Sequence, residues 1–251
     1  MDLAFAAIAL APGLALGSFL NVVAARVPLR RSIVSPGSAC MSCGHEIAWQ
    51  DNIPVVSWLL LRGRCRSCGA AIPARYPAIE LVSALLVAAC VWHFGLHAET
   101  AVAVLFCLVL VAISATDLEH GIIPNRIVLP AAPLVLLAQT AIRPGPQWAI
   151  GAVAASGFLF AAALASPGGM GMGDVKLALV LGAMLGKTVS VAMLVGMVGA
   201  VVPSLYLLLR HGMAARKAKL PFGPFLAVGG LVALFWGPQL LDRYWSLFHA
   251  R

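Results

Sequence analysis

Four cysteines in the first third of the chain form two closely spaced pairs. Each pair has two residues between its cysteines, and 21 residues separate the pairs. The pairs are Cys40-Met41-Ser42-Cys43 and Cys65-Arg66-Ser67-Cys68. Two such pairs bring four thiolates to one tetrahedral ion, and this spacing is close to that of four-cysteine zinc sites. Because four sulfur ligands leave no open position for a substrate, the predicted role of Zn²⁺ is structural.

His45 follows the first pair and is a possible substitute ligand, although a solvated histidine beside the cysteines is the simpler interpretation. Three basic residues near the second pair would suit a zinc-ribbon contact with nucleic acid. They are Arg62, Arg64 and Arg66. Membrane topology and anionic headgroups explain these arginines better, so we expect membrane lipids and no nucleic acid as partners.

Two of the nine acidic residues have more specific settings than the others. Asp117 ends one apolar segment, and Asp174 follows the glycine-rich run 168–173 at the start of another. Alone, an aspartate at a helix end is more often a cap, and a glycine run is more often only a turn. Together, two carboxyl groups near hydrocarbon tend to share a proton, so that one activates water while the other donates a proton to the scissile amide. The pair predicts an aspartic peptidase with Asp117 and Asp174 as catalytic residues.

Residues near the two aspartates have simpler interpretations. The glycines before Asp174 allow close backbone approach of an extended substrate. Lys176 is interpreted as a cytoplasmic anchor on another helix face, and Asn125 and Glu119 as helix-end residues.

These residues must be positioned by membrane helices, because the composition excludes a soluble protein. The chain of 251 residues is 61% hydrophobic and 10% charged, whereas soluble domains are about 45–50% apolar and 25% charged. About eight segments reach the roughly 17–25 apolar residues that a spanning helix needs, or approach that length. They run approximately 3–25, 77–94, 100–116, 127–142, 148–165, 175–186, 188–209 and 223–247. The predicted fold is all-α, a polytopic membrane helix bundle in which Cys90 and Cys107 are small buried hydrophobes.

The basic residues predict the orientation of this bundle. Seven arginines lie between the first two spans, and positive charge gathers in cytoplasmic loops. With eight spans, thirteen of the seventeen Lys and Arg residues lie on the cytoplasmic side, as do Asp117 and Asp174. Both termini are then periplasmic, and the reducing cytoplasm disfavours disulfides in the cysteine loop.

Three regions follow from this layout. Residues 1–25 form the first transmembrane helix, 26–76 a cytoplasmic four-cysteine metal-binding domain, and 77–251 a seven-helix membrane peptidase domain.

Several stretches, taken in order, resemble the bacterial prepilin leader peptidases, which often also N-methylate their product. The resemblance covers nearly the whole chain. Beside the two cysteine pairs and the Asp117 stretch with Pro124-Asn125, the stretches are Gly17-Ser18-Phe19-Leu20-Asn21-Val22-Val23, Ala74-Arg75-Tyr76-Pro77-Ala78-Ile79-Glu80-Leu81, Gly171-Met172-Gly173-Asp174 and Pro221-Phe222-Gly223-Pro224-Phe225.

The resemblance implies an enzyme of the bacterial inner membrane that cleaves the basic leader of type IV prepilins and pseudopilins. Such enzymes cut after a glycine, on the cytoplasmic side. Asp117 and Asp174 stand at the positions of the catalytic aspartates, and Cys40, Cys43, Cys65 and Cys68 at those of the metal ligands. The resemblance also implies S-adenosylmethionine as donor of a methyl group to the new N-terminus. The residues give no account of where that donor binds, because no dinucleotide-type glycine fingerprint follows a strand.

Two other functions fit parts of the pattern. A proton-coupled carrier also uses membrane aspartates, but it would place them nearer the midplane and within paired inverted repeats. A non-enzymatic membrane assembly factor built around the zinc loop would require residues 26–76 and tolerate loss of both aspartates. The aspartic peptidase is the preferred interpretation.

Overall fold

The computed structural model describes residues 2–165, 170–212 and 221–249. Six residues used in the sequence argument lie outside these ranges: Gly168, Gly169, Arg216, Lys217, Lys219 and Arg251. Within these ranges the regular structure is helical, and only two isolated β-bridges occur beside it. The all-α fold class is therefore confirmed.

Eight long helices make up most of the described chain. They are α1 (Asp2–Arg26), α3 (Arg75–Phe94), α4 (Ala98–His120), α5 (Asn125–Ile142), α6 (Gln147–Ala165), α7 (Met172–Leu185), α8 (Val189–His211) and α9 (Gly223–His249). Three short helices accompany them: η1 (Trp49–Asn52), α2 (Val56–Leu60) and η2 (Gly186–Thr188).

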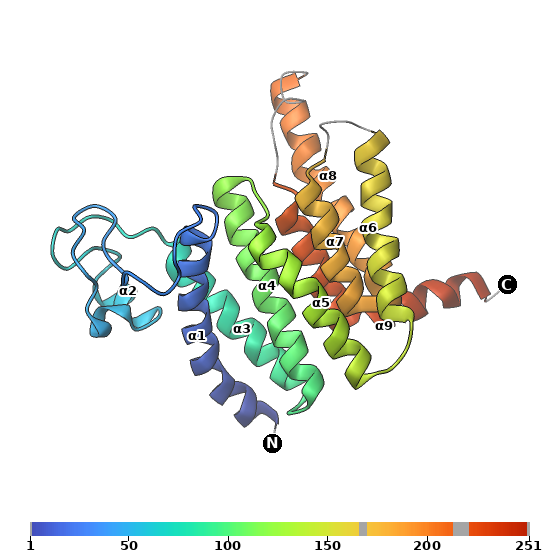
Figure 1. Ribbon diagram of the computed structural model, residues 1–251, viewed down its shortest axis with the longest axis horizontal. Coiled ribbons are helices and arrows are strands. Elements are labelled where there is room, and N and C mark those ends of the chain that lie inside the picture. Colours follow the sequence, from blue (N-terminus) through green and yellow to red (C-terminus); the bar gives the residue numbers. More distant parts are fainter. Residues whose placement is uncertain (1, 166–169, 213–220, 250–251) are drawn as a thin grey trace. The chain divides into compact units, whose positions relative to one another are not determined.

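Seven helical runs of the described chain are long and apolar enough to cross a membrane, one fewer than expected. The difference arises because the expected spans 175–186 and 188–209 lie in one run of 39 residues, Met172–Arg210. Within this run α7 has only 14 residues and ends at Gly186, whose φ is +56°. Figure 1 shows α7 and α8 as two separate helices on either side of this break.

The chain divides by its internal contacts into two compact units, Met1–Ala115 and Thr116–Arg251. Helix α4 begins in the first unit and ends in the second. The expected division into residues 1–25, 26–76 and 77–251 describes membrane topology instead, and it stays a prediction.

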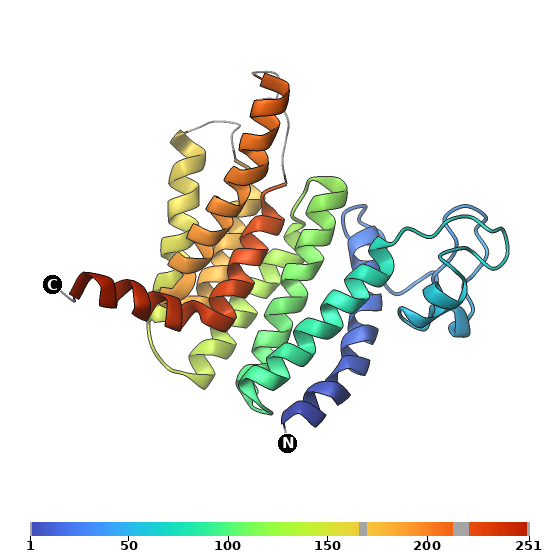
Figure 2. The same ribbon diagram turned by 180° about the vertical axis from the view of Figure 1, so that it is seen from behind.

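In the first unit, two glycines let the backbones of α1 and α3 approach closely. A Cβ on Gly13 would lie 2.6 Å from the Ala84 Cα, and one on Gly17 would lie 2.6 Å from the Glu80 Cα. Lipid provides no hydrophobic drive between helices, so small residues and close van der Waals contact hold membrane helices together. Figures 1 and 2 show α1 and α3 side by side, and this packing fixes Glu80 against α1.

The second unit uses the same kind of contact twice. A Cβ on Gly182 of α7 would overlap the backbone of Gly151 in α6, and one on Gly229 of α9 would overlap the Ala192 carbonyl in α8. Helix α9 is bent in both ribbon views and contains Pro238, which cannot donate the backbone hydrogen bond of a regular helix. These pairs fix α7, which carries Asp174, and α9, which begins at Gly223.

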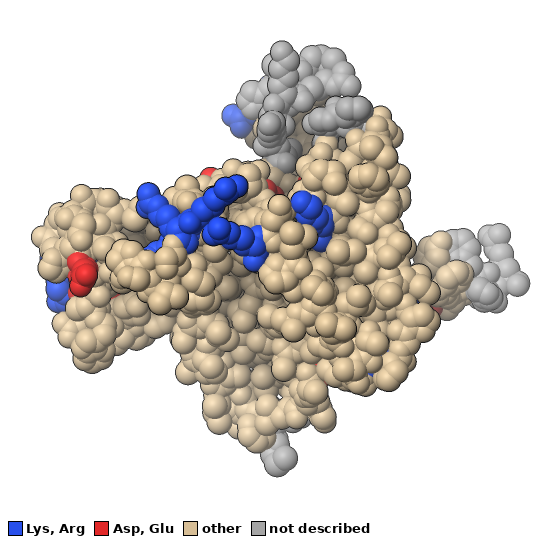
Figure 3. Space-filling model, viewed as in Figure 1, with Lys and Arg blue, Asp and Glu red and all other residues tan. Residues whose placement is uncertain are grey.

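Large apolar side chains are exposed along the helices of both units. Figure 3 shows wide areas of the face in view without a single charged side chain. A surface of this kind is unfavourable in water and is expected where helices face hydrocarbon. The exposed surface therefore agrees with a multi-pass membrane protein.

Candidate functional site

Each cysteine pair forms the same tight backbone turn. The Cys40 N–H donates to the His45 carbonyl, and the Gly44 N–H donates to the Cys40 carbonyl, both at 2.9 Å. The second pair repeats this pattern around Cys65 and Gly69. The φ angles of Gly44 and Gly69 are +70° and +72°, in the left-handed region that favours glycine. Glycine at these two positions therefore allows both turns to close without strain.

The two turns bring all four cysteines together. Their sulfur atoms lie within 4.8 Å of one another, and the Cys40 and Cys68 Sγ atoms are 3.9 Å apart. Four sulfurs at about 2.3 Å from a tetrahedral zinc ion lie about 3.8 Å from each other, so the cluster fits such an ion. The ligand group found in the described chain consists of these four thiols, and His45 is not part of it.

The chemistry of the thiols also suits a metal ion. Backbone N–H groups of Cys43 and Ser42 lower the pKa of the Cys40 thiol to about 6, because they stabilise the thiolate. At Cys68 the Ala70 N–H lowers the pKa, but the neighbouring thiols and loss of water outweigh it and raise the pKa to about 11. Four adjacent thiols become thiolates together only when a cation balances their charge, and a bound metal supplies that cation.

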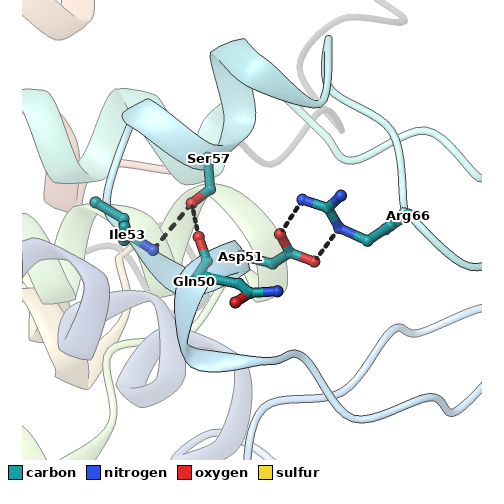
Figure 4. A network of polar contacts seen from close by, with 5 residues as sticks. All are labelled: Gln50, Asp51, Ile53, Ser57 and Arg66. Carbon is teal, nitrogen blue, oxygen red and sulfur yellow. Dashed lines mark hydrogen bonds and ion pairs between the residues drawn. The ribbon is translucent and has the colours of Figure 1, made fainter.

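A polar network joins η1 to the second cysteine pair (Figure 4). Arg66 donates from Nε and from one Nη to the two carboxylate oxygens of Asp51, at 2.7 and 2.6 Å. The Ser57 hydroxyl donates to the Gln50 carbonyl at 2.8 Å and accepts the Ile53 N–H at 3.0 Å. Arg66, which the sequence assigns to the membrane surface, therefore stabilises the loop through a bidentate ion pair.

Asp117 lies in the last turn of α4 and is 6% exposed. Its Oδ2 accepts a hydrogen bond of 2.9 Å from the backbone N–H of Gly223, the first residue of α9. A Cβ on Gly223 would lie 2.7 Å from this oxygen. Only glycine therefore lets the start of α9 approach the carboxyl group without displacing it.

Asp174 is the third residue of α7 and is 9% exposed. Its N–H donates to the Gly171 carbonyl at 3.1 Å, which closes the first turn of the helix. A Cβ on Gly171 would lie 3.3 Å from the Asp174 Oδ2. Gly171 thus places no side chain beside the carboxyl group.

Ile123 connects the surroundings of the two aspartates. A Cβ on Gly173, next to Asp174, would lie 2.8 Å from the Ile123 Cβ. A Cβ on Gly223, the hydrogen-bond donor to Asp117, would lie 3.3 Å from the Ile123 Cδ1. The two carboxyl groups also interact electrostatically. The structure therefore brings Asp117 and Asp174 to one place, although they are 57 positions apart in the sequence.

Lys176 has a more specific environment than the expected cytoplasmic anchor. Its Nζ donates to the Asn125 Oδ1 at 2.9 Å. Asn125 is the first residue of α5, and no hydrogen bond from a side chain caps that helix end. The pair joins the starts of α5 and α7 beside Asp174, so both residues belong to the framework of the site.

Several of these relations have no signature in the sequence. The stretch Pro221–Phe225 contains a single glycine, and only the structure shows that this Gly223 meets Asp117. The position of Ile123 in the surroundings of both aspartates and the hydrogen bond from Lys176 to Asn125 likewise depend on tertiary contacts. Cys90 and Cys107 are buried as expected, with their sulfurs 3.7 Å apart.

Comparison with protein families gives two adjacent matches. Residues 12–94 match the bacterial peptidase A24 N-terminal domain, and residues 104–209 match the type IV leader peptidase family. The first match contains all four clustered cysteines, and the second contains both Asp117 and Asp174.

Individual relatives are similar over nearly the whole chain. A prepilin leader peptidase/N-methyltransferase of Bacillus subtilis is 38% identical over 237 residues, which cover 92% of this chain and 94% of the relative. A protein of the same name from Pseudomonas aeruginosa is 37% identical over 274 aligned positions, covering 96% of this chain and 94% of the relative. No solved structure is significantly similar to the chain.

Proposed function

Because the chain belongs to the type IV leader peptidase family, we propose that it is a membrane aspartic endopeptidase acting on prepilins. Its proposed substrates are type IV prepilins and secretion pseudopilins, from which it removes the basic leader after a glycine. It then methylates the new N-terminus with S-adenosylmethionine. The relatives named above carry both activities in their names.

One observation carries the peptidase half of this proposal. Asp117 and Asp174 are both buried and lie near each other in the second unit. Gly223 contacts Asp117, and Ile123 lies close to both Gly223 and Gly173, the residue before Asp174. Few acidic residues occur in the chain, and an ionisable residue buried among membrane helices is a candidate functional residue. Two carboxyl groups held together have the arrangement that aspartic peptidases use.

The proposed reaction uses the two carboxyl groups as an acid and a base. One carboxylate takes a proton from a water molecule, whose oxygen adds to the carbonyl carbon of the scissile peptide. The other carboxyl group gives its proton to the amide nitrogen as the C–N bond breaks. The products are the free leader, ending in a carboxylate, and the mature pilin with a new amino group. Because the groups are coupled, the two roles belong to the pair.

The backbone beside Asp174 supports binding of an extended substrate. Gly171 and Gly173 present no side chain on the approach to α7, and Gly171 lies close to the carboxyl group. A peptide must be extended to expose its scissile bond, and bare backbone leaves room for it. The apolar stem of the substrate would pack against the membrane helices.

The four cysteines are proposed to hold one structural Zn²⁺ ion. Cys40, Cys43, Cys65 and Cys68 supply all four ligands of a tetrahedral site. The ion would cross-link the two turns of the loop and take no part in peptide cleavage. The alternative that His45 replaces a thiol has no support from the cluster geometry.

The proposed orientation follows the positive-inside rule. Residues 26–76 form a cytoplasmic domain between the first helix and a seven-helix peptidase region, and both termini are periplasmic. The enzyme is placed in the bacterial inner membrane with lipids as neighbours and no nucleic acid partner. Eight passes require the chain to cross back after Gly186, where α7 ends and η2 begins.

Cleavage of a model prepilin by purified protein tests the proposal. The variants Asp117→Asn and Asp174→Asn remove one carboxyl group each, and Asp242→Asn, at an exposed position of α9, is the matched control. We expect wild type and Asp242→Asn to cleave alike, and the other two to lose activity by about a thousandfold or more. Mass spectrometry of the product, with and without S-adenosylmethionine, reports cleavage and methylation separately.

Cleavage at the wild-type rate by either dyad variant would remove that residue from the mechanism. If neither variant affected function while loss of residues 26–76 abolished it, the non-enzymatic zinc-loop function would replace the peptidase.

A further inference from the structure

The first unit contains a cavity that peptide cleavage does not use. Its volume is about 600 Å³, and its lining residues all fall between Ala15 and Glu80. This volume lies in the range of small-molecule sites, roughly 300–1,000 Å³. Residues from the stretches 17–23 and 74–81 line the cavity, and these stretches have no role in the peptidase site.

Glu80 supplies a buried negative charge to the wall of this cavity. Glu80 is only 8% exposed, and its Oε2 accepts a hydrogen bond of 2.7 Å from the Val55 N–H. Ser18 and Asn21 lie beside the carboxyl group. These described partners are all neutral, so they orient the carboxylate without balancing its charge. A buried carboxylate of this kind favours a positively charged ligand.

Of the other charged residues of the wall, Glu46 is exposed and the remaining three are already engaged. Asp51 is held by Arg66 in the bidentate ion pair. Arg26 donates to the carbonyl oxygens of Ser32 and Gly37, at 3.2 and 3.0 Å. Among the described lining residues, Glu80 is therefore the buried carboxylate that remains available to pair with a cation.

The backbone that contacts Glu80 is strained. Val55 has a φ of +61°, which is rare for a β-branched residue. The Val55 N–H donates its hydrogen bond to Glu80, so the carboxylate helps to hold this backbone conformation. Backbone strain of this kind clusters at ligand sites, where the surrounding structure maintains it.

Aromatic side chains form another part of the wall. Phe19, Trp58 and Tyr76 line the cavity. The Trp58 indole is fixed by a hydrogen bond from Nε1–H to the Ile72 carbonyl at 3.0 Å. Flat apolar surfaces next to a carboxylate suit a ligand that combines a ring system with positive charge.

We infer that this cavity binds the methyl donor S-adenosylmethionine, with Glu80 balancing its positive charge and the aromatic wall accommodating its adenine ring. The cavity size, the uncompensated carboxylate and the aromatic lining together support this assignment. The inference rests on the proposed methyl transfer and concerns a site within the first unit alone.

Equilibrium binding of radiolabelled S-adenosylmethionine to the full-length, zinc-loaded protein in lipid nanodiscs tests the assignment. Glu80→Gln keeps an acceptor for the Val55 N–H and removes the charge. We expect it to weaken binding by about tenfold to a hundredfold and to leave prepilin cleavage within about twofold of wild type. Asp242→Asn, which changes an exposed carboxylate of α9 outside the cavity lining, is the control and should bind normally.

Two further measurements separate charge from structure. S-adenosylhomocysteine lacks the sulfonium charge, so Glu80→Gln should weaken its binding less than that of S-adenosylmethionine. Val22→Trp fills the cavity without changing its charge, and it should abolish donor binding while cleavage continues.

Three outcomes would overturn the inference. Wild-type affinity in both Glu80→Gln and Val22→Trp would place the donor elsewhere, and so would photo-crosslinking of the label to residues 116–251. Either result leaves the peptidase and the methyl transfer standing. Absence of both binding and methylation in a wild type that cleaves would remove the methyl transfer as well.

Discussion

At the level of single residues, the aspartate pair depends on a glycine that has no reactive group. Gly223 donates its N–H to Asp117 and leaves no room for a Cβ between them. Gly223→Ala would push the carboxyl group aside, so cleavage should fall about tenfold to a hundredfold. Gly157→Ala in α6 is the control, since nothing lies within 4 Å of the added atom. Equal initial rates for both variants would show that Gly223 does not position Asp117.

A second prediction concerns the ion pair of the loop. The Arg66 guanidinium holds the pKa of the Asp51 carboxyl below its ordinary value of 3.8. For a lowered pKa, the stabilisation is present above the unfolded value and is lost as the pH falls through the folded value. Wild type should therefore protect residues 49–66 from hydrogen exchange better than Asp51→Asn does near pH 6, and this difference should vanish at acidic pH.

The size of this difference should be small, because Arg66 is 62% exposed and water screens the pair. A difference that persists unchanged below the lowered pKa would contradict an ionic origin.

At the level of elements, the segment between α1 and α3 has little regular structure of its own. It contains η1, α2 and two isolated bridges, at Ala39 with Glu46 and at Arg64 with Ala71. A segment with few helical or strand hydrogen bonds relies on cross-links, and the metal would join its two turns.

Removal of the metal should therefore loosen this segment and spare the helices. Cys43→Ser, or treatment with a strong chelator, should raise hydrogen exchange across residues 36–73 and leave α1 and α3 protected. Zinc content measured by mass spectrometry should fall from about one ion per chain to near zero. Ser42→Ala, beside the same cysteine, is the control. Unchanged exchange in metal-free protein would show that the ion does not hold the loop.

The helices themselves were largely predictable, because long apolar segments with charged ends have few alternatives in a membrane. The helical break at Gly186 was predictable too, because Gly186 and the charged Lys187 separate the expected spans 175–186 and 188–209. The cysteine cluster was predictable because its spacing and its turn glycines are local features.

Contacts between distant elements had no local signal. The surroundings of Asp117 depend on Gly223, 106 residues later, and Lys176 meets Asn125 across 51 residues. Sequence spacing shows on which face of its own helix a residue lies, but it does not show which residue of another helix contacts that face. The buried Glu80 was visible only as an acidic residue at the start of a span, and the cavity beside it was not visible at all.

At the level of the whole molecule, the apolar exterior means that the lipid bilayer is the solvent of this protein. Helix α7 has 14 residues, which corresponds to a length of about 21 Å. The hydrocarbon core of a typical bilayer is about 30 Å thick. Asp174 at one end of α7 and Gly186 at the other therefore cannot both reach the two surfaces of an undistorted bilayer.

The short helix makes bilayer thickness a determinant of catalysis. Most of α7 is buried among its neighbouring helices, so the bilayer around the second unit must thin, or water must reach Asp174 below the headgroups. Thinning is easier with short acyl chains. The rate of prepilin cleavage in vesicles of lipids with 14-carbon acyl chains should exceed the rate in vesicles of lipids with 22-carbon chains. As a control, the same two preparations should cleave at equal rates after they are dissolved in detergent. Equal rates in both kinds of vesicle would mean that α7 is not strained by the membrane. A cell that changes its acyl-chain length would, by this route, also change how fast its prepilins mature.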